Sequence, residues 1–296
     1  MTGADAQWAG AAALRPSAWR ALRTSAWLGW EMESNWTSPV LFLLYSVVRP
    51  LAGVGIVVFM YIAVATAANL HDPSRLAFVF VGSTAFMFVG QELYGISQAV
   101  LEDREHYRTL KYVYIAPSSI YAYLVGRGLA RVVETGISAT VAIAVGAFLL
   151  HIDFSALNAP LLILAVLLGV LGIATFGIML AGIVLLTARH GFQMGESVAA
   201  VFFFLGGVVF PIHILPSWVQ PVSYALPVTY WVEAVRRSLI GSAGQADSFL
   251  AQLPTATLLL LIGTTTAVFF VLSVVVFRQF DRAARRKGRI DITTSF

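Results

Sequence analysis

The chain contains no cysteine and few charged residues. Of its 296 residues, 11% are charged and 58% are hydrophobic. An ordinary soluble domain carries about 25% charged residues. No soluble fold of this size could bury so much apolar surface, so the composition predicts a membrane protein. The absence of cysteine excludes a disulfide framework, a thiolate metal site and a thiol nucleophile.

Sequence motifs for catalysis are also missing. Only two lysines occur, Lys111 and Lys287, and neither follows a glycine, so the Gly-x-x-x-x-Gly-Lys-Ser/Thr phosphate loop is absent. No two of the five histidines lie within four residues of each other, which argues against a helical metal pair. No Gly-x-Ser-x-Gly elbow is present either. We therefore expect no enzyme activity, cofactor or metal in this chain.

Long apolar stretches dominate the rest of the sequence. Six of them approach the roughly 20 residues that a helix needs to cross a bilayer. They are residues 39–68, 76–100, 130–150, 160–188, 196–215 and 254–277. Four prolines interrupt residues 211–241, which favours a re-entrant helical hairpin between spans five and six rather than further crossings. The prediction is an all-α membrane protein with six transmembrane helices in residues 39–278.

The first 38 residues predict a further helix, in the plane of the membrane surface. Trp19, Leu22, Trp27 and Trp30 recur at helical spacing beside Arg20, Arg23 and Ala26. An amphipathic helix with basic and tryptophan side chains is typical of the membrane interface. A helix that only holds the chain on the membrane is as compatible with this pattern as one with a mechanical role.

Lysine and arginine are distributed unevenly between the two sides that six spans would define. With a cytoplasmic N-terminus, the outer side holds only Arg75, Arg236 and Arg237, and Arg49 falls inside the first span. The other fifteen fall on the inner side: Arg15, Arg20, Arg23, Arg104, Arg108, Lys111, Arg127, Arg131, Arg189, Arg278, Arg282, Arg285, Arg286, Lys287 and Arg289. This bias predicts that both termini, including a basic tail at 279–296, are cytoplasmic. Because the positive charges orient the chain in the membrane, the net charge of +4 does not predict a nucleic-acid partner.

The most informative polar stretch joins spans two and three, at about residues 101–116. Its charged and aromatic residues fall at helical spacing, as Leu101, Arg104, Glu105, Arg108 and Tyr112 illustrate. This pattern predicts a short charged helix on the cytoplasmic side. It is either a docking element for a cytosolic partner or a solvated surface helix.

Ionisable residues inside predicted spans are functional candidates because hydrocarbon makes them costly. Arg49 lies in span one and Glu92 in span two, with Glu134 near the inner end of span three. Arg49 could contact an anionic substrate or headgroup, or pair with Glu92 or Glu134. Aromatic residues around span five could line an exit route or simply pack between helices. The candidate path residues are Arg49, Glu92, Phe203, Phe210, Tyr230 and Trp231.

Two blocks of the sequence resemble the membrane subunit of ABC transporters of the ABC-2 type, which are mostly exporters. One is the 101–116 stretch with Ala116-Pro117 and Gly126-Arg127 after it. The other comprises Gly206-Gly-Val-Val-Phe-Pro211, Leu215-Pro-Ser-Trp218 and Leu226-Pro-Val-Thr-Tyr230, followed by Arg236-Arg237. The resemblance covers roughly residues 19–282.

The resemblance implies a multi-pass permease of the plasma (bacterial inner) membrane, working as a homodimer or with a similar chain. Separate ABC ATPase subunits would bind ATP and Mg²⁺, and the 101–116 segment would be the coupling helix seated in them. The residues that match this contact are Glu102, Arg104, Glu105, Tyr107, Arg108, Thr109 and Leu110. The expected cargo is a lipophilic drug, as in multidrug efflux, a lipid or a lipid-linked glycan.

Two other function classes stay open at this point. One is an ion-coupled secondary transporter or channel that uses Glu92, Glu134 and Arg49 as a relay. Such proteins often contain inverted repeats, and the sequence shows none. The other is a membrane-embedded enzyme or scaffold, for which no catalytic cluster is recognisable.

Overall fold

A computed structural model of the chain describes residues 18–34, 38–70, 72–116, 119–187, 191–241 and 249–288. Within these ranges the secondary structure is helical and contains no strand. The longer helices are α2 (Ala18–Ser34), α3 (Pro39–Ala67), α4 (Pro73–Leu101), α6 (Ile120–Leu149), α7 (Ala159–Thr187), α8 (Gly191–Leu205), α10 (Pro227–Ile240) and α11 (Thr255–Arg286). The shorter ones are η1 (Glu102–His106), α5 (Leu110–Ile115), η3 (Ile212–Ile214), α9 (Gln220–Ala225) and η5 (Phe249–Gln252). The prediction of an all-α chain is confirmed.

Five helices of the described chain are long and apolar enough to cross a membrane: α3, α4, α6, α7 and α11. The predicted fifth span, 196–215, differs from the structure because α8 has only 15 residues and ends at Leu205. The backbone N–H of Gly206 donates to the Phe202 carbonyl at 2.8 Å, and Gly207 has a φ of 66°. Glycine adopts this left-handed conformation without strain, and it commonly ends helices. A count of six spans therefore requires that the short helix α8 is one of them.

Two predicted boundaries moved because charged helical turns extend beyond the apolar windows. The third span was expected to begin at residue 130, but α6 begins at Ile120 and carries Arg127 and Arg131 on its first turns. Similarly, α11 continues to Arg286, so the first part of the predicted basic tail is helical. Residues 1–17 and 289–296 lie outside the described part of the chain.

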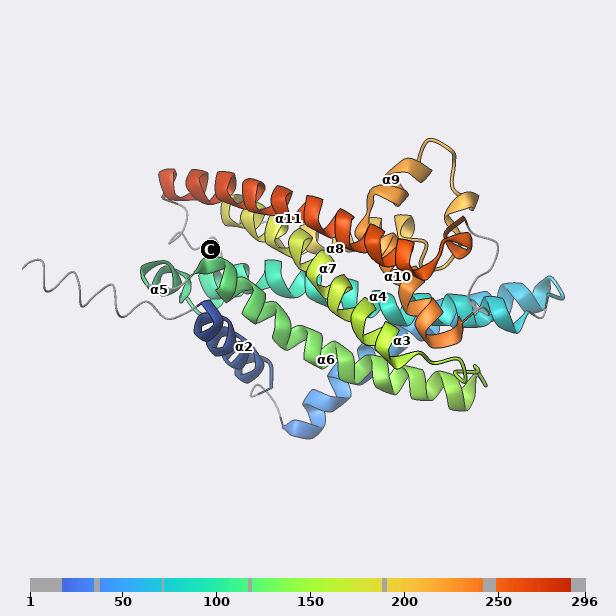
Figure 1. Cartoon of the computed structure of the whole chain (residues 1–296). Coiled ribbons are helices and arrows are strands. Elements are labelled where there is room, and N and C mark those ends of the chain that lie inside the picture. The colour runs from blue at the N-terminus through green and yellow to red at the C-terminus, as the bar shows by residue number, and fades with distance from the viewer. Residues whose placement is uncertain are drawn as a thin grey trace, which may run out of the picture.

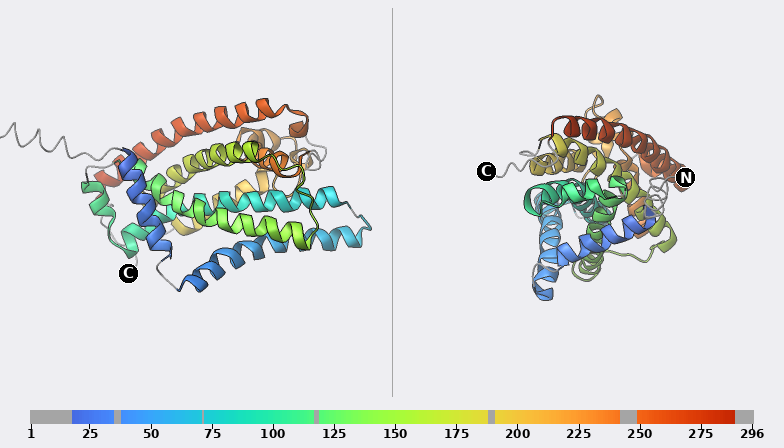
Figure 2. Two further views of the ribbon diagram at one scale, coloured as in Figure 1. Left: turned by 60° about the horizontal axis from the view of Figure 1, so that its bottom comes forward. Right: turned by 90° about the vertical axis from the view of Figure 1, so that its left-hand side faces the viewer.

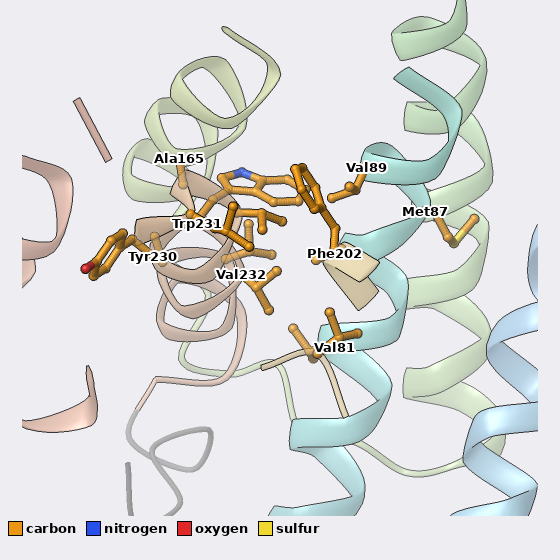
Figure 3. Packing of buried hydrophobic residues seen from close by; sticks show 14 of the residues in the cluster. Val81, Met87, Val89, Ala165, Phe202, Tyr230, Trp231 and Val232 are labelled. Atoms are coloured by element: carbon orange, nitrogen blue, oxygen red, sulfur yellow. The ribbon is translucent and has the colours of Figure 1, made fainter. Parts of the chain in front are cut away.

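The helices form a bundle in which α4 is central (Figure 1). It packs against α6, α7, α8 and α10, while α11 packs along α7. The largest buried cluster surrounds Trp231 of α10, with Phe202 of α8 and Val81 and Val89 of α4 nearby (Figure 3). By contrast, α3 and α11 turn many apolar side chains outward, as lipid or a second protein chain would require.

The helices that do not run along the bundle lie at its two ends. Helices α2 and α5 lie at one end, where α2 crosses the long helices, and α9 and α10 lie at the other (Figure 2). The region predicted as a hairpin, 211–241, consists of η3, α9 and α10. Every residue of α10 is buried, against α4, α7 and α11.

Candidate functional site

The predicted coupling segment is not one continuous helix. Helix α4 passes into the π-helical turn η1, where the N–H of Tyr107 donates to the Glu102 carbonyl at 2.9 Å. Arg108 then takes a left-handed φ of 54°, and the N–H of Thr109 donates to the Asp103 carbonyl at 2.7 Å. Helix α5 begins at Leu110. The prediction of a single helix over 101–116 is wrong, because the chain breaks at 107–109 and folds back on η1.

A buried ion cluster holds η1 against α6. Asp103 is fully buried, accepts a 2.6 Å hydrogen bond from the Tyr123 hydroxyl and lies 3.8 Å from the Arg127 guanidinium. The same guanidinium lies 3.2 Å from the Glu102 carboxylate and contacts the sulfur of Met32 in α2. Arg127 therefore joins three elements, η1, α6 and α2. Neither Asp103 nor Arg127 was among the coupling residues predicted from sequence.

Arg104 joins η1 to α7 and does not face solvent. Its Nη1 donates to the carbonyls of Val184 and Leu185, at 3.3 and 3.2 Å, in the last turn of α7. A cation stabilises such C-terminal carbonyls. The Arg104 Nε donates to Glu105 at 3.0 Å, and the Glu105 side chain is only 14% exposed. Both residues were predicted to contact a partner; Arg104 is buried in the segment's own packing, whereas Glu105 is only partly buried.

Helix α5 is fastened to α11 by a third set of contacts. The Tyr114 hydroxyl donates to Asp281 at 2.8 Å, and Arg285 pairs with Asp281 at 3.1 Å. The Arg285 guanidinium also lies 4.6 Å from the centre of the Tyr114 ring. Burial, and then the neighbouring Asp281, raises the pKa of Tyr114, so the hydroxyl remains a donor throughout the physiological range. Leu110, another predicted contact residue, is buried beneath this segment.

One face of the segment stays open. A hollow of about 540 Å³ lies at this end, lined by Met32, Gln98, Leu101, Glu102, Glu105, His106 and Tyr107. Arg108 follows Tyr107 in the chain, is exposed and makes no ion pair with any described residue, and Tyr112 is 63% exposed. Of the predicted contact residues, Glu102, Glu105, Tyr107 and Arg108 thus reach this surface.

A larger cavity of about 700 Å³ lies between α3, α4, α6 and α8. Its apolar wall includes Val54, Val57, Phe86, Met87 and Phe203. Its polar wall includes Gln91, Tyr94, Arg131, Glu134 and Glu196, with Arg131 and Glu134 paired at 3.7 Å. An apolar pocket with a few polar groups is the usual form of a small-molecule site.

The predicted path residues divide between this cavity and the core. Phe203 lines the cavity and packs edge-on against Phe86, with ring centres 5.0 Å apart. Phe210 packs instead on Phe204, at 5.8 Å. Tyr230 and Trp231 do not line the cavity, because both are buried in the core (Figure 3). Arg49 belongs to α3, but its side chain lies outside the described part of the structure.

Glu92 is buried in α4 and does not line the cavity. Its Oε2 atom is inaccessible and has no hydrogen-bond partner among the described residues. Such orphaned buried atoms are rare in folded proteins. Because an ionisable group of this kind is costly, its presence favours a functional role.

Replacing Glu92 by methionine is expected to raise stability and lower transport. The substitution removes a buried polar group without a partner, which should gain about 1–3 kcal/mol. Thermal unfolding in detergent and transport in vesicles measure the two effects. A loss of stability would reveal a partner for the carboxyl, and unchanged transport would leave Glu92 a structural role.

Arg236 holds together the break after α8 at the opposite end of the bundle. Its Nη2 donates to the carbonyls of Gly207 and Val208, at 2.8 and 2.5 Å, and its Nε donates to the Phe78 carbonyl at 3.2 Å. The guanidinium carbon lies 3.5 Å from the centre of the Phe78 ring. A Cβ on Gly82 would collide with both Arg236 and the Val208 carbonyl, so this close approach requires glycine. Arg236 thus fixes the end of α8 to α4.

Arg237, its neighbour, is also buried. It pairs with Glu233 at 3.2 Å and donates to the carbonyls of Leu250 and Leu253. The sequence-based count placed Arg236 and Arg237 on the outer side of the membrane, without assigning them partners. In the structure both side chains are buried and donate hydrogen bonds to backbone carbonyls, and Arg237 also pairs with the Glu233 carboxylate.

Replacing Arg236 by glutamine is expected to destabilise the chain by about 2–3 kcal/mol, because buried carbonyls lose a charged donor. Thermal unfolding in detergent measures the loss. Arg278→Gln provides the matched control, since Arg278 is exposed on α11. Equal stability of the two variants would contradict the structural role of Arg236.

Comparison with known protein families gives a match. The sequence model of a family described as ABC-2 type transporter matches residues 24–240, which include both the 101–116 segment and α10. A comparison with curated proteins finds no match.

Proposed function

The chain belongs to the ABC-2 type transporter family, and we propose that it is the permease subunit of an ATP-driven exporter. The cargo would be a lipophilic drug, a lipid or a lipid-linked glycan, taken from the cytoplasm or the inner leaflet. ATP and Mg²⁺ would bind to separate ABC ATPase subunits. The chain would act with a second copy of itself or with a paralogous permease.

The observation that carries this proposal is the construction of the 101–116 segment. Through Arg127, Arg104 and Tyr114 it is bonded to α6, α7 and α11, while its other face stays open. A force applied to the open face would therefore reach three long helices at once. That is the arrangement needed by a subunit whose energy arrives from a partner.

Membrane placement follows from the same proposal. Helix α8 would be the fifth of six spans, with α9 and α10 re-entrant at the outer side. Both termini would then be cytoplasmic in a plasma (bacterial inner) membrane, in agreement with the excess of inner arginine and lysine. The end that holds α2 and α5 would be the cytoplasmic end.

The cavity between α3, α4, α6 and α8 supports a lipophilic cargo. Apolar side chains such as Val54, Phe86 and Phe203 form one wall, and polar groups are concentrated on the other. Helix α3 beside it exposes apolar residues such as Phe59 and Met60, which a second permease chain would cover.

The alternative function is ion-coupled transport, favoured by the orphaned carboxyl oxygen of Glu92 and the Arg131–Glu134 pair in the cavity. Two tests separate these functions: purification of the chain together with any phosphate-loop ATPase bound to it, and reconstitution in vesicles with and without that ATPase. We expect ATP to drive transport and a panel of drugs, lipids and glycolipids to identify substrates by stimulated ATP hydrolysis. Transport by the purified chain alone under a proton gradient would support the alternative.

A further inference from the structure

A second groove, of about 740 Å³, lies between α2 and α6 and is separate from the cavity described above. Helix α2 crosses α6 closely because small residues meet at the contact. Ala21 and Ser25 are buried there, and a Cβ on Gly126 would collide with the backbone of α2. Beside this contact, residues of both helices line the groove.

The groove combines positive charge, tryptophan and an apolar floor. Arg20 and Arg23 line it from α2, and both are exposed. Trp27, which is 65% exposed, stands beside them. Leu129 and Val133 of α6 extend the surface along a helix that is apolar and long enough to span the bilayer, and Val133 is 55% exposed.

These three features match the three parts of an anionic phospholipid. Guanidinium groups bind phosphate oxygens by paired, charge-assisted hydrogen bonds. Indole rings favour the level of the headgroups, and an exposed apolar helix face suits an acyl chain. Basic pockets between helices at the cytoplasmic side of a membrane commonly bind acidic headgroups. No other part of the ligand needs a specific protein group.

We propose that the α2–α6 groove binds an anionic phospholipid, with its phosphate at Arg20 and Arg23 and an acyl chain along Leu129 and Val133. The bound lipid fills the space between the surface helix and the span. It thereby becomes part of the end of the bundle that carries the 101–116 segment. This site is additional to the proposed export function and needs only a membrane around the chain.

Brominated lipids test the site, because bromine quenches nearby tryptophan fluorescence. The full chain is placed in vesicles of phosphatidylcholine with a minor fraction of phosphatidylglycerol, and only one of the two lipids carries bromine. The difference between the wild type and a Trp27→Phe, Trp30→Phe variant isolates the signal of the groove from the other tryptophans. We expect brominated phosphatidylglycerol to be preferred over brominated phosphatidylcholine about tenfold, since each arginine contributes to the attraction.

The double variant Arg20→Gln, Arg23→Gln should lose this preference. Arg278→Gln with Arg282→Gln, which removes the same charge from exposed positions at the inner end of α11, should keep it. If the first double variant has a lowered thermal midpoint, Thr24→Asp replaces it, because it puts a negative charge at an exposed position of the same groove. Quenching by the two lipids in proportion to their mole fractions in the wild type, or an equal loss of preference in the α11 control, would overturn the proposal.

Discussion

Replacing Arg127 by methionine is expected to lower the free energy of unfolding by about 3–5 kcal/mol, the usual effect of removing one partner from a buried ion pair. The substitution leaves the fully buried Asp103 without a cation and frees Glu102 as well. It also removes the contact with Met32 that joins α2 to the cluster. Denaturant titration in mixed micelles measures the loss.

A second variant separates the lost charge pair from lost packing. Adding Glu102→Gln and Asp103→Asn to Arg127→Met removes the uncompensated charges, so most of the stability should return. Arg278→Met, at an exposed position, controls for the substitution itself. If the triple variant is no more stable than Arg127→Met, the buried charges are not the cause of the loss.

Replacing Arg108 by glutamate is expected to weaken binding of the ATPase by about tenfold or more, without affecting folding. Arg108 is exposed next to Tyr107, which lines the open hollow, and it has no ion pair with a described residue, so the fold does not need its charge. A docking surface that accommodates a guanidinium would meet a carboxylate instead, and like charges that face each other across an interface cost affinity. Titration of the ATPase onto the chain in nanodiscs measures this change.

The choice of Arg108 over Glu105 depends on the structure. Glu105→Arg would place a second guanidinium against the buried Arg104 and disturb folding, which makes it a poor test of docking. Arg282→Glu on α11 provides a charge-reversed control at an exposed position. Unchanged ATPase affinity in Arg108→Glu would remove this residue from the docking surface.

The membrane helices could be predicted from sequence because lipid imposes a length and a composition on each of them. Helix α3 and α7 begin and end within about one residue of the predicted spans, within the usual uncertainty of helix ends. Helices α6 and α11 extend beyond their predicted spans, whereas α8 ends before the predicted end of its span. Residues 206–210 are as apolar as a span, but Gly207 and the carbonyl contacts of Arg236 end the helix early. A hydropathy pattern contains no information about such a tertiary contact.

The charges of residues 101–116 predicted a short polar element there, but its side chains could not be assigned to faces, and its role in coupling stays a prediction. Helical periodicity placed Arg104, Glu105 and Arg108 on one surface, whereas the π turn and the break at Arg108 rotate Arg104 inward. The burial of Asp103 depends on Arg127, which is 24 residues away on another helix. A pair of opposite charges at the inner ends of two neighbouring spans was the signal available in the sequence.

If an ATPase subunit docks on the segment at 101–116, a cross-linker attached to that segment should capture it. The natural chain has no cysteine, so a single substitution introduces a unique thiol. Tyr112→Cys places it on the exposed face of α5, and Ser217→Cys places it at the opposite end of the bundle. With a thiol-to-amine cross-linker in an active complex, we expect position 112 to attach to the ATPase and position 217 not to. Attachment at 217, or none at 112, would contradict this expectation.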